Sequence, residues 1–167
     1  MLHTTLNLLR KANACTSRYK VLCKALGGAK RYGYSSPISI TFIVENNGLD
    51  DALWALRAVS NEKLGDKIAR LFAVGCGYRV LPNFEKNFPN DYRIRMCLES
   101  SCLYAFGELT DQELSAAESA AWSAAESAAR SAARSAAWSA TEFAEQMWQK
   151  QFLLELLNPN HPIHKEV

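Results

Sequence analysis

The side chains in this sequence that could do chemistry most readily are five cysteines and three histidines. A catalytic thiolate needs a nearby base or cation, and a structural metal site needs several ligands at defined spacing. Cys97 and Cys102 have no histidine near them in sequence, while His161 and His164 stand in a tail after Pro159. The pattern predicts buried apolar thiols and solvated tail histidines, with no metal site and no cofactor.

Motifs for catalysis or nucleotide binding do not stand out either. The stretch LGGAKRYG at residues 26–33 is rich in glycine and holds a lysine. It lacks the strand–loop–helix frame of a phosphate-binding loop, so it predicts the end of a helix and a turn. The acidic residues are dispersed, and no two carboxylates suggest an acid and base couple. We therefore predict that the protein is not an enzyme.

The charge is distributed unevenly along the chain. Residues 1–44 hold seven lysines and arginines and no acid, which leaves 12 basic and 17 acidic residues in the remainder. A basic end beside an acidic body predicts contact with an acidic protein surface or a nucleic acid, and a solvated basic helix face is the alternative. The candidate partner-binding residues are Arg18, Lys20, Lys24, Lys30, Arg31, Tyr32 and Tyr34.

The elements that must position these residues are expected to be helices. Apolar spacing, caps and breakers predict an all-α fold, a bundle of about five to six helices around a long Ala/Ser-rich C-terminal helix. Residues 38–44 fit either a short helix opened by Ser36-Pro37 or a strand. The other expected helices run from Thr4 or Thr5 to Gly27, over 49–59, from 66 to a stop at Pro82, and over 90–106.

The alanine-rich segment has a serine at every fourth position from Ser115 to Ser139. Alanine is the best helix former, and Thr110 with Glu113 forms a capping box, so one helix is expected over about 110–158, with a break allowed near Thr141–Phe143. Each four-residue unit rotates by about 40° relative to the previous one, so the alanine strip winds around the helix. A central core helix is the leading interpretation. A partner surface, a homodimer contact and an ice-binding array are the alternatives.

Length and composition predict one helical domain over residues 1–167. The expected parts are a basic helix and loop at 1–34, a helical body at 35–109, the long helix at 110–158 and a tail at 159–167. Five cysteines without a CxxC pair favour a reducing compartment, and no apolar run approaches the roughly 20 residues that span a bilayer. We expect a cytoplasmic protein that has no membrane partner. A transit peptide is the minor alternative for the acid-free start.

Three blocks together resemble a known group of proteins. The blocks are Asn47–Val59, Ala69–Thr110 and the alanine-rich helix that follows, and they cover about two-thirds of the chain. They resemble an alanine-rich helical family of immunity-like proteins from polymorphic-toxin systems, with phage-encoded relatives. The residues that carry the resemblance are Phe84, Glu85, Pro89, Asp91, Arg93, Arg95, Gly107 and Glu108.

The resemblance implies an all-α protein that binds and blocks another protein, either a toxin or a host defence component. A phage member would act in the host cytoplasm. No catalytic residue is carried over from the family. The alternative function is nucleic-acid binding, in which the basic N-terminal segment contacts phosphates and Tyr19, Tyr32 and Tyr34 stack on bases.

Overall fold

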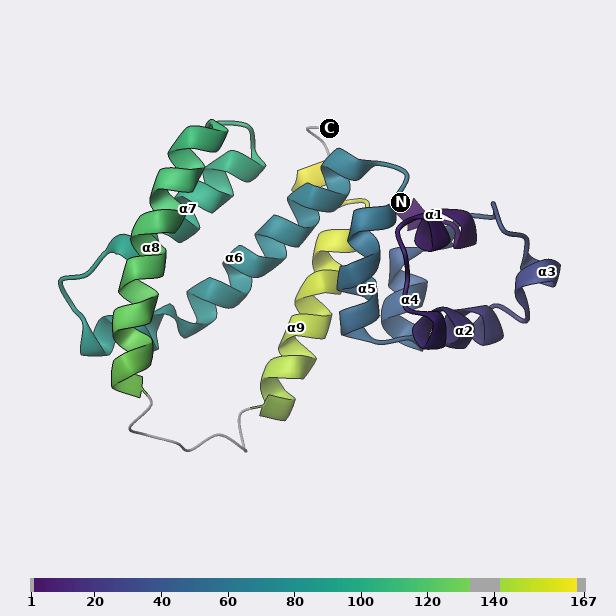
Figure 1. Cartoon of the computed structure of the whole chain (residues 1–167), viewed down its shortest axis with the longest axis horizontal. Helices are drawn as coiled ribbons and strands as arrows, with labels where there is room; N and C mark the ends of the chain where they lie inside the picture. Colours follow the sequence, from purple (N-terminus) through teal and green to yellow (C-terminus); the bar gives the residue numbers. More distant parts are fainter. Residues whose placement is uncertain (1, 133–141, 165–167) are drawn as a thin grey trace. The chain divides into compact units, whose positions relative to one another are not determined.

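The computed structural model describes residues 2–132 and 142–164, and it confirms an all-α fold. The chain divides into two compact units (Figure 1). Unit 1 consists of residues 1–69 and 146–167, and unit 2 of residues 70–145. No described helix is both long enough and apolar enough to cross a membrane. Each unit is described separately below.

Unit 1 begins with a short strand that ties together distant parts of the chain. Strand β1 (His3–Thr4) pairs antiparallel with β2 (Ile38–Ser39). Thr4 also forms a bridge with Val59, and its fully buried hydroxyl donates to the carbonyl of Ala58. The sequence provides no obvious partner for a strand at residue 38, because strands of two residues are too short to show an alternating pattern.

The N-terminal helix predicted from the sequence is in fact two helices, α1 (Leu6–Lys11) and α2 (Thr16–Ala25). The cap predicted at Thr5 is confirmed, since its hydroxyl accepts from the Leu8 amide at 3.1 Å. The prediction of one continuous helix is wrong because the backbone turns at Asn13, whose φ is 61°. Asparagine tolerates this left-handed conformation better than most residues.

Four short elements follow in unit 1. They are α3 (Ala29–Tyr32), α4 (Ile40–Asn46), α5 (Leu49–Ala55) and the 3-10 helix η1 (Leu56–Ala58). The helix expected near residues 38–44 exists, but its cap is Ser39 rather than Ser36, because Ser39 accepts from the amide of Phe42 at 3.1 Å. The helix ends at Asn46, just before Gly48, whose φ is 95°.

The core of unit 1 draws on both ends of the chain. Helix α9 (Glu142–Leu157) and the 3-10 helix η2 (Pro162–His164) contribute apolar side chains beside those of the N-terminal helices. Members with almost no exposed surface are Leu6, Ile38, Ile40, Ile43, Leu56, Ile68, Leu153 and Leu157. Burial of this kind contributes about 1.5–3 kcal/mol for each large side chain, so the helices that surround it are held firmly.

Unit 2 contains most of α6 (Glu62–Asn87), together with α7 (Arg93–Ala105) and α8 (Asp111–Ala132). Helices α7 and α8 run side by side (Figure 1). The predicted capping box is confirmed, because the Thr110 amide donates to the Glu113 carboxylate at 2.9 Å and the Glu113 amide donates back to the Thr110 hydroxyl at 3.4 Å.

Helix α6 does not stop at Pro82, so that prediction is wrong. A proline removes one amide donor and bends a helix, but neighbouring contacts can hold the following turns. Here the rings of Phe84 and Phe88 stack at 5.0 Å, and Arg95 of α7 binds Glu85 through two bonds of 2.8 and 2.9 Å.

The alanine-rich helix α8 is covered on one side only. Leu114 is buried and Ala117 and Ala121 are half-buried, whereas Trp122 is 75% exposed. Within residues 111–123, only one narrow face of the helix is therefore packed in the core, as the core interpretation predicts. Residues 133–141, through which the predicted long helix would continue and which include Trp138 and Thr141, lie outside the described residues. The other two residues of the range in which a break was expected, 142 and 143, belong to α9.

Gly65 of α6, which lies against backbone atoms of η1, gives a test of this packing. A Cβ atom at Gly65 would lie 2.5 Å from the Leu56 carbonyl oxygen and 2.7 Å from Val59 Cγ2. We expect Gly65→Ala to lower the free energy of unfolding by about 1–2 kcal/mol, because the clash outweighs the higher helix propensity of alanine. Urea denaturation followed by circular dichroism measures this change.

Gly77→Ala is the matched control. A Cβ there would meet the end of the Leu98 side chain, which can move, whereas a backbone carbonyl cannot. The control should change stability by less than about 1 kcal/mol. Equal stability of Gly65→Ala and the wild type would contradict the close approach of α6 to η1.

Candidate functional site

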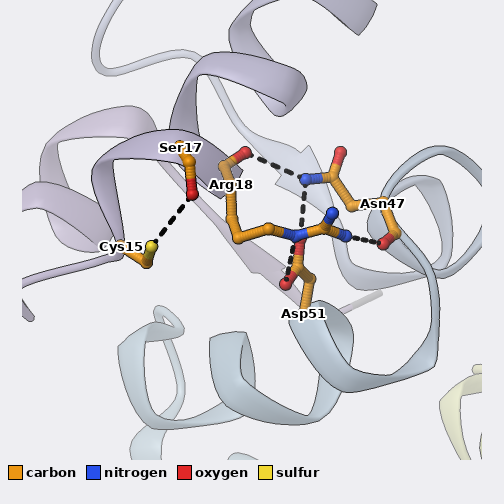
Figure 2. A network of polar contacts seen from close by, with 5 residues as sticks. All are labelled: Cys15, Ser17, Arg18, Asn47 and Asp51. Atoms are coloured by element: carbon orange, nitrogen blue, oxygen red, sulfur yellow. Dashed lines mark hydrogen bonds and ion pairs between the residues drawn. The ribbon is translucent and has the colours of Figure 1, made fainter.

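Three helices of unit 1 meet at the side chain of Asn47, which ends α4 and is 8% exposed (Figure 2). Its amide nitrogen donates to the carbonyl of Arg18 on α2 at 3.1 Å. The same nitrogen donates to the carboxylate of Asp51 on α5 at 2.8 Å. One buried amide group therefore fixes the position of α2 relative to the corner between α4 and α5.

Arg18 completes this network from the other side. Its Nε donates to both carboxylate oxygens of Asp51, at 3.0 and 2.8 Å, and its terminal nitrogen donates to the Asn47 carbonyl. The sequence assigned Arg18 to a partner surface. In the structure its guanidinium is half-exposed but is already paired with Asp51. Its first role is therefore to hold helices together.

A pocket of about 230 Å³ adjoins the network. Its buried walls are apolar, and its exposed lining residues, among them Cys15, Arg18 and Asp50, form the open side. The full lining is Leu9, Ala14, Cys15, Arg18, Tyr19, Leu22, Ile43, Asn47, Asp50, Asp51, Trp54 and Ala55. Concave sites with apolar walls and a few polar groups are typical of small-molecule binding.

Cys15 lies at the N-terminal end of α2, exposed at the open side of this pocket. Its sulfur lies 3.2 Å from the Ser17 hydroxyl. That hydroxyl, with the backbone amides of Arg18 and Ser17, lowers the pKa of Cys15 because these groups stabilise the thiolate. The sequence analysis missed this thiol because it placed Cys15 inside one continuous helix. The sequence feature that could have indicated this thiol is the pair of hydroxyl residues Thr16-Ser17 directly after the cysteine.

The thiols of unit 2 have a different environment. Cys97 and Cys102, which were predicted to be buried, are half-buried, and so is Cys76. Burial raises the pKa of Cys76 and of Cys97. Across residues 2–132 and 142–164, no cluster of three or more histidine, cysteine or acidic side chains could hold a metal ion.

The basic residues of the N-terminal segment do reach the surface. Lys20 and Lys24 lie one turn apart on α2, on the side opposite the buried Leu22. Together with the cations of α1 and α3, they form no ion pair with any residue that the structure describes. The six exposed cations, here called the basic surface, are Arg10, Lys11, Lys20, Lys24, Lys30 and Arg31.

The tyrosines near the basic surface are less available. Tyr32 is half-buried, and its hydroxyl donates to the Pro37 carbonyl at 2.6 Å. The hydroxyl of Tyr19 is shielded from solvent. Tyr34 is exposed, although its backbone carbonyl accepts from the amide of Asn7 at 3.0 Å. Of the three rings that base stacking would use, only that of Tyr34 is exposed.

Helix α7 presents an apolar face to solvent that the sequence analysis did not identify. Apart from Arg93, which pairs with Asp91, its exposed positions and the exposed residues at its two ends follow one another at intervals of 4, 3, 4 and 3 residues. The first two, Tyr92 and Met96, are 57% and 60% exposed. The set, called the α7 stripe, is Tyr92, Met96, Glu99, Leu103 and Phe106. The spacing is visible in the sequence.

Six of the eight residues that carry the family resemblance lie in α6, in α7 or in the loop between them, and Gly107 and Glu108 follow α7. Arg95 pairs with Glu85, and Arg93 pairs with Asp91 at 2.6 Å. Comparison of the chain with protein-family models, curated proteins and solved structures finds no match. The resemblance to immunity-like proteins therefore stays a prediction.

The network at Asn47 predicts a large effect on stability. Asn47→Ala removes both amide hydrogen bonds and leaves a void beside the buried carboxylate edge of Asp51. We expect the free energy of unfolding to fall by about 1–3 kcal/mol. Asn46→Ala, which removes one exposed bond to the Phe42 carbonyl, should cost less than about 1 kcal/mol. Equal losses in the two variants, measured by urea denaturation, would argue against the network.

The thiol environments predict a difference in reactivity. Because its thiolate is stabilised, Cys15 should be half-alkylated by iodoacetamide at a lower pH than Cys76 or Cys97. Mass spectrometry of peptides after short exposures across pH 6–10 measures each site. Ser17→Ala should move the Cys15 profile to higher pH. The idea fails if Cys15 reacts no faster than the half-buried thiols.

Proposed function

We propose that the protein is a non-enzymatic binding protein that acts by blocking a partner protein, as an immunity-like or phage anti-defence inhibitor. The observation that carries the proposal is the α7 stripe, in which four of five solvent-facing positions are large and apolar or aromatic. Proteins rarely keep such a face in water without a partner, and tyrosine, methionine and other aromatic residues are enriched at interfaces.

The energy available from the stripe is sufficient for recognition. Full burial of one large apolar side chain contributes about 1.5–3 kcal/mol, and these four are roughly half-exposed in the free chain. Covering them therefore supplies about 3–6 kcal/mol before the cost of association. That amount accounts for a central binding patch but requires additional polar contacts for high affinity.

The partner element that fits this stripe is an α-helix with apolar residues at the same alternating spacing and a basic residue opposite Glu99. Intervals of four and three residues are those with which helices pack lengthwise. Glu99 lies in the middle of the stripe and forms no ion pair with a described residue. A second copy of this chain fits less well, because symmetric pairing of two stripes would place Glu99 against Glu99.

The basic surface supports the same proposal in a different way. Six exposed cations, which form no ion pair with the described residues, attract an acidic partner and speed its association, and they confer specificity more than affinity. Nucleic-acid binding has weaker support, because the Tyr19 and Tyr32 side chains are engaged or partly covered. Arg31, Lys30 and Tyr34 remain candidate contacts. Action in the cytoplasm, that of the host for a phage protein, is part of the proposal.

The experiment is capture of partners from nuclease-treated bacterial lysate by the purified full-length chain. Three forms are compared: wild type, Met96→Lys/Leu103→Lys, and the control Val80→Lys. Val80 is an exposed apolar residue of α6 outside the stripe. We expect one stoichiometric protein to be retained by the wild type and by the control. The stripe variant should lose at least about ten-fold in affinity, since two buried contacts are removed.

Equal retention by all three forms, or no retained protein, would contradict the proposal. Nucleic acid captured without nuclease and released by salt would favour the alternative function. A triple variant, Lys20→Glu/Lys24→Glu/Lys30→Glu, tests the contribution of the basic surface separately from that of the α7 stripe. It should slow association and reduce the salt dependence of association while leaving the dissociation rate almost unchanged. Surface plasmon resonance with the captured partner measures both rates.

A further inference from the structure

We infer that the pocket of unit 1 binds a small, uncharged organic molecule that has an apolar body and one hydroxyl group. The inference concerns a different unit from the α7 stripe and does not depend on the proposed function. It rests on the size and walls of the pocket, on two unpaired polar atoms among its lining residues, and on the charges at its open side.

The size and walls of the pocket determine the body of the ligand. A cavity of about 150 Å³ is large enough to hold benzene, so about 230 Å³ accommodates a six-membered ring with a few further atoms. Leu9, Leu22, Ile43 and Ala55 form buried apolar walls, and the indole of Trp54 is half-buried beside them. Contact with such walls stabilises an apolar ring or a short branched chain more than a polar body.

Two polar atoms of the lining residues are the reason for assigning a hydroxyl group to the ligand. In the described part of the chain, the buried side-chain oxygens and nitrogens without a hydrogen-bond partner are Tyr19 Oη and Asn47 Oδ1. Both residues line this pocket. An unpaired buried polar group costs about 1–3 kcal/mol, and native proteins contain few of them. A ligand hydroxyl can accept from a tyrosine and donate to an amide oxygen.

Tyr19 remains a donor over the relevant pH range. Burial, followed by the neighbouring Cys23 thiol, raises the pKa of Tyr19, yet Cys23 does not give the hydroxyl an ordinary hydrogen bond. The free chain shields both oxygens from water. Pairing therefore requires the half-buried Tyr19 side chain to shift slightly when the ligand enters, which is a rearrangement common at binding sites.

The charges at the open side argue against an anionic ligand. Arg18 is paired with Asp51, and Asp50 adds a second carboxylate nearby. A negative group would be repelled here, and any ion would lose its hydration against the apolar walls. An uncharged molecule avoids both costs.

The test titrates three probes of one shape, namely phenol, benzene and benzoate, into the full-length protein. Amide chemical shifts in nitrogen-15 NMR spectra report both affinity and location. We expect saturable shifts confined to the neighbourhood of the pocket. Phenol should bind about twenty-fold more tightly than benzene, because its hydroxyl gains two hydrogen bonds that each contribute about five-fold, and benzoate should bind most weakly.

Variants link the binding to named residues. Ala55→Leu should abolish the saturable shifts by filling the pocket. Because that change can also disturb the core, Tyr19→Phe provides a second test, which should weaken phenol about five-fold and leave benzene unchanged. Tyr32→Phe is the matched control, since its hydroxyl binds the Pro37 carbonyl outside the pocket lining, and it should change neither affinity.

Two results would overturn the inference. One is the absence of saturable shifts for phenol and benzene in the wild type. The other is a phenol affinity of Tyr19→Phe equal to that of Tyr32→Phe, which would show that the unpaired hydroxyl has no part in binding.

Discussion

The arrangement of unit 1 depends on one buried amide group. The Asn47 side chain joins the backbone of α2 to the carboxylate at the start of α5, while its own residue ends α4 (Figure 2). A buried amide that forms directional bonds in two directions specifies a single packing of three helices, which apolar contacts alone would not do. The pocket lies between the same helices, so its shape follows from this constraint.

In unit 2, several charged side chains form ion pairs between helices, and the solvent-facing side of α7 is largely apolar. Arginines of α6 and α7 pair with acids inside the unit, as Arg95 does with Glu85 and Arg70 with Glu118 at 3.7 Å. The guanidinium of Arg70 also lies 4.7 Å from the centre of the Tyr104 ring. These contacts use charged side chains to join the helices, while the outer face of α7 is left largely apolar. A protein that binds another protein through a helix face has this distribution.

The two proposals concern separate units and different chemistry. The α7 stripe offers an apolar helix face for a macromolecular partner, whereas the pocket beside Cys15 offers a small concave site. A ligand in that pocket would add to the stability of unit 1, because it would bind the folded chain and not the unfolded one. Blocking of a partner does not require that ligand, so either property can be present without the other.

The sequence by itself determined the helical class, the capping box at Thr110 and a first helix capped by Thr4 or Thr5, because caps depend on residues within one turn of each other. It also indicated the exposed cations, since a segment without acids has no local partners for them. Only the tertiary structure decided that α6 passes through Pro82, that Arg18 pairs with Asp51, and that Cys15 opens a helix beside a pocket. Those features arise from contacts between residues far apart in sequence, whose energies no local pattern reveals.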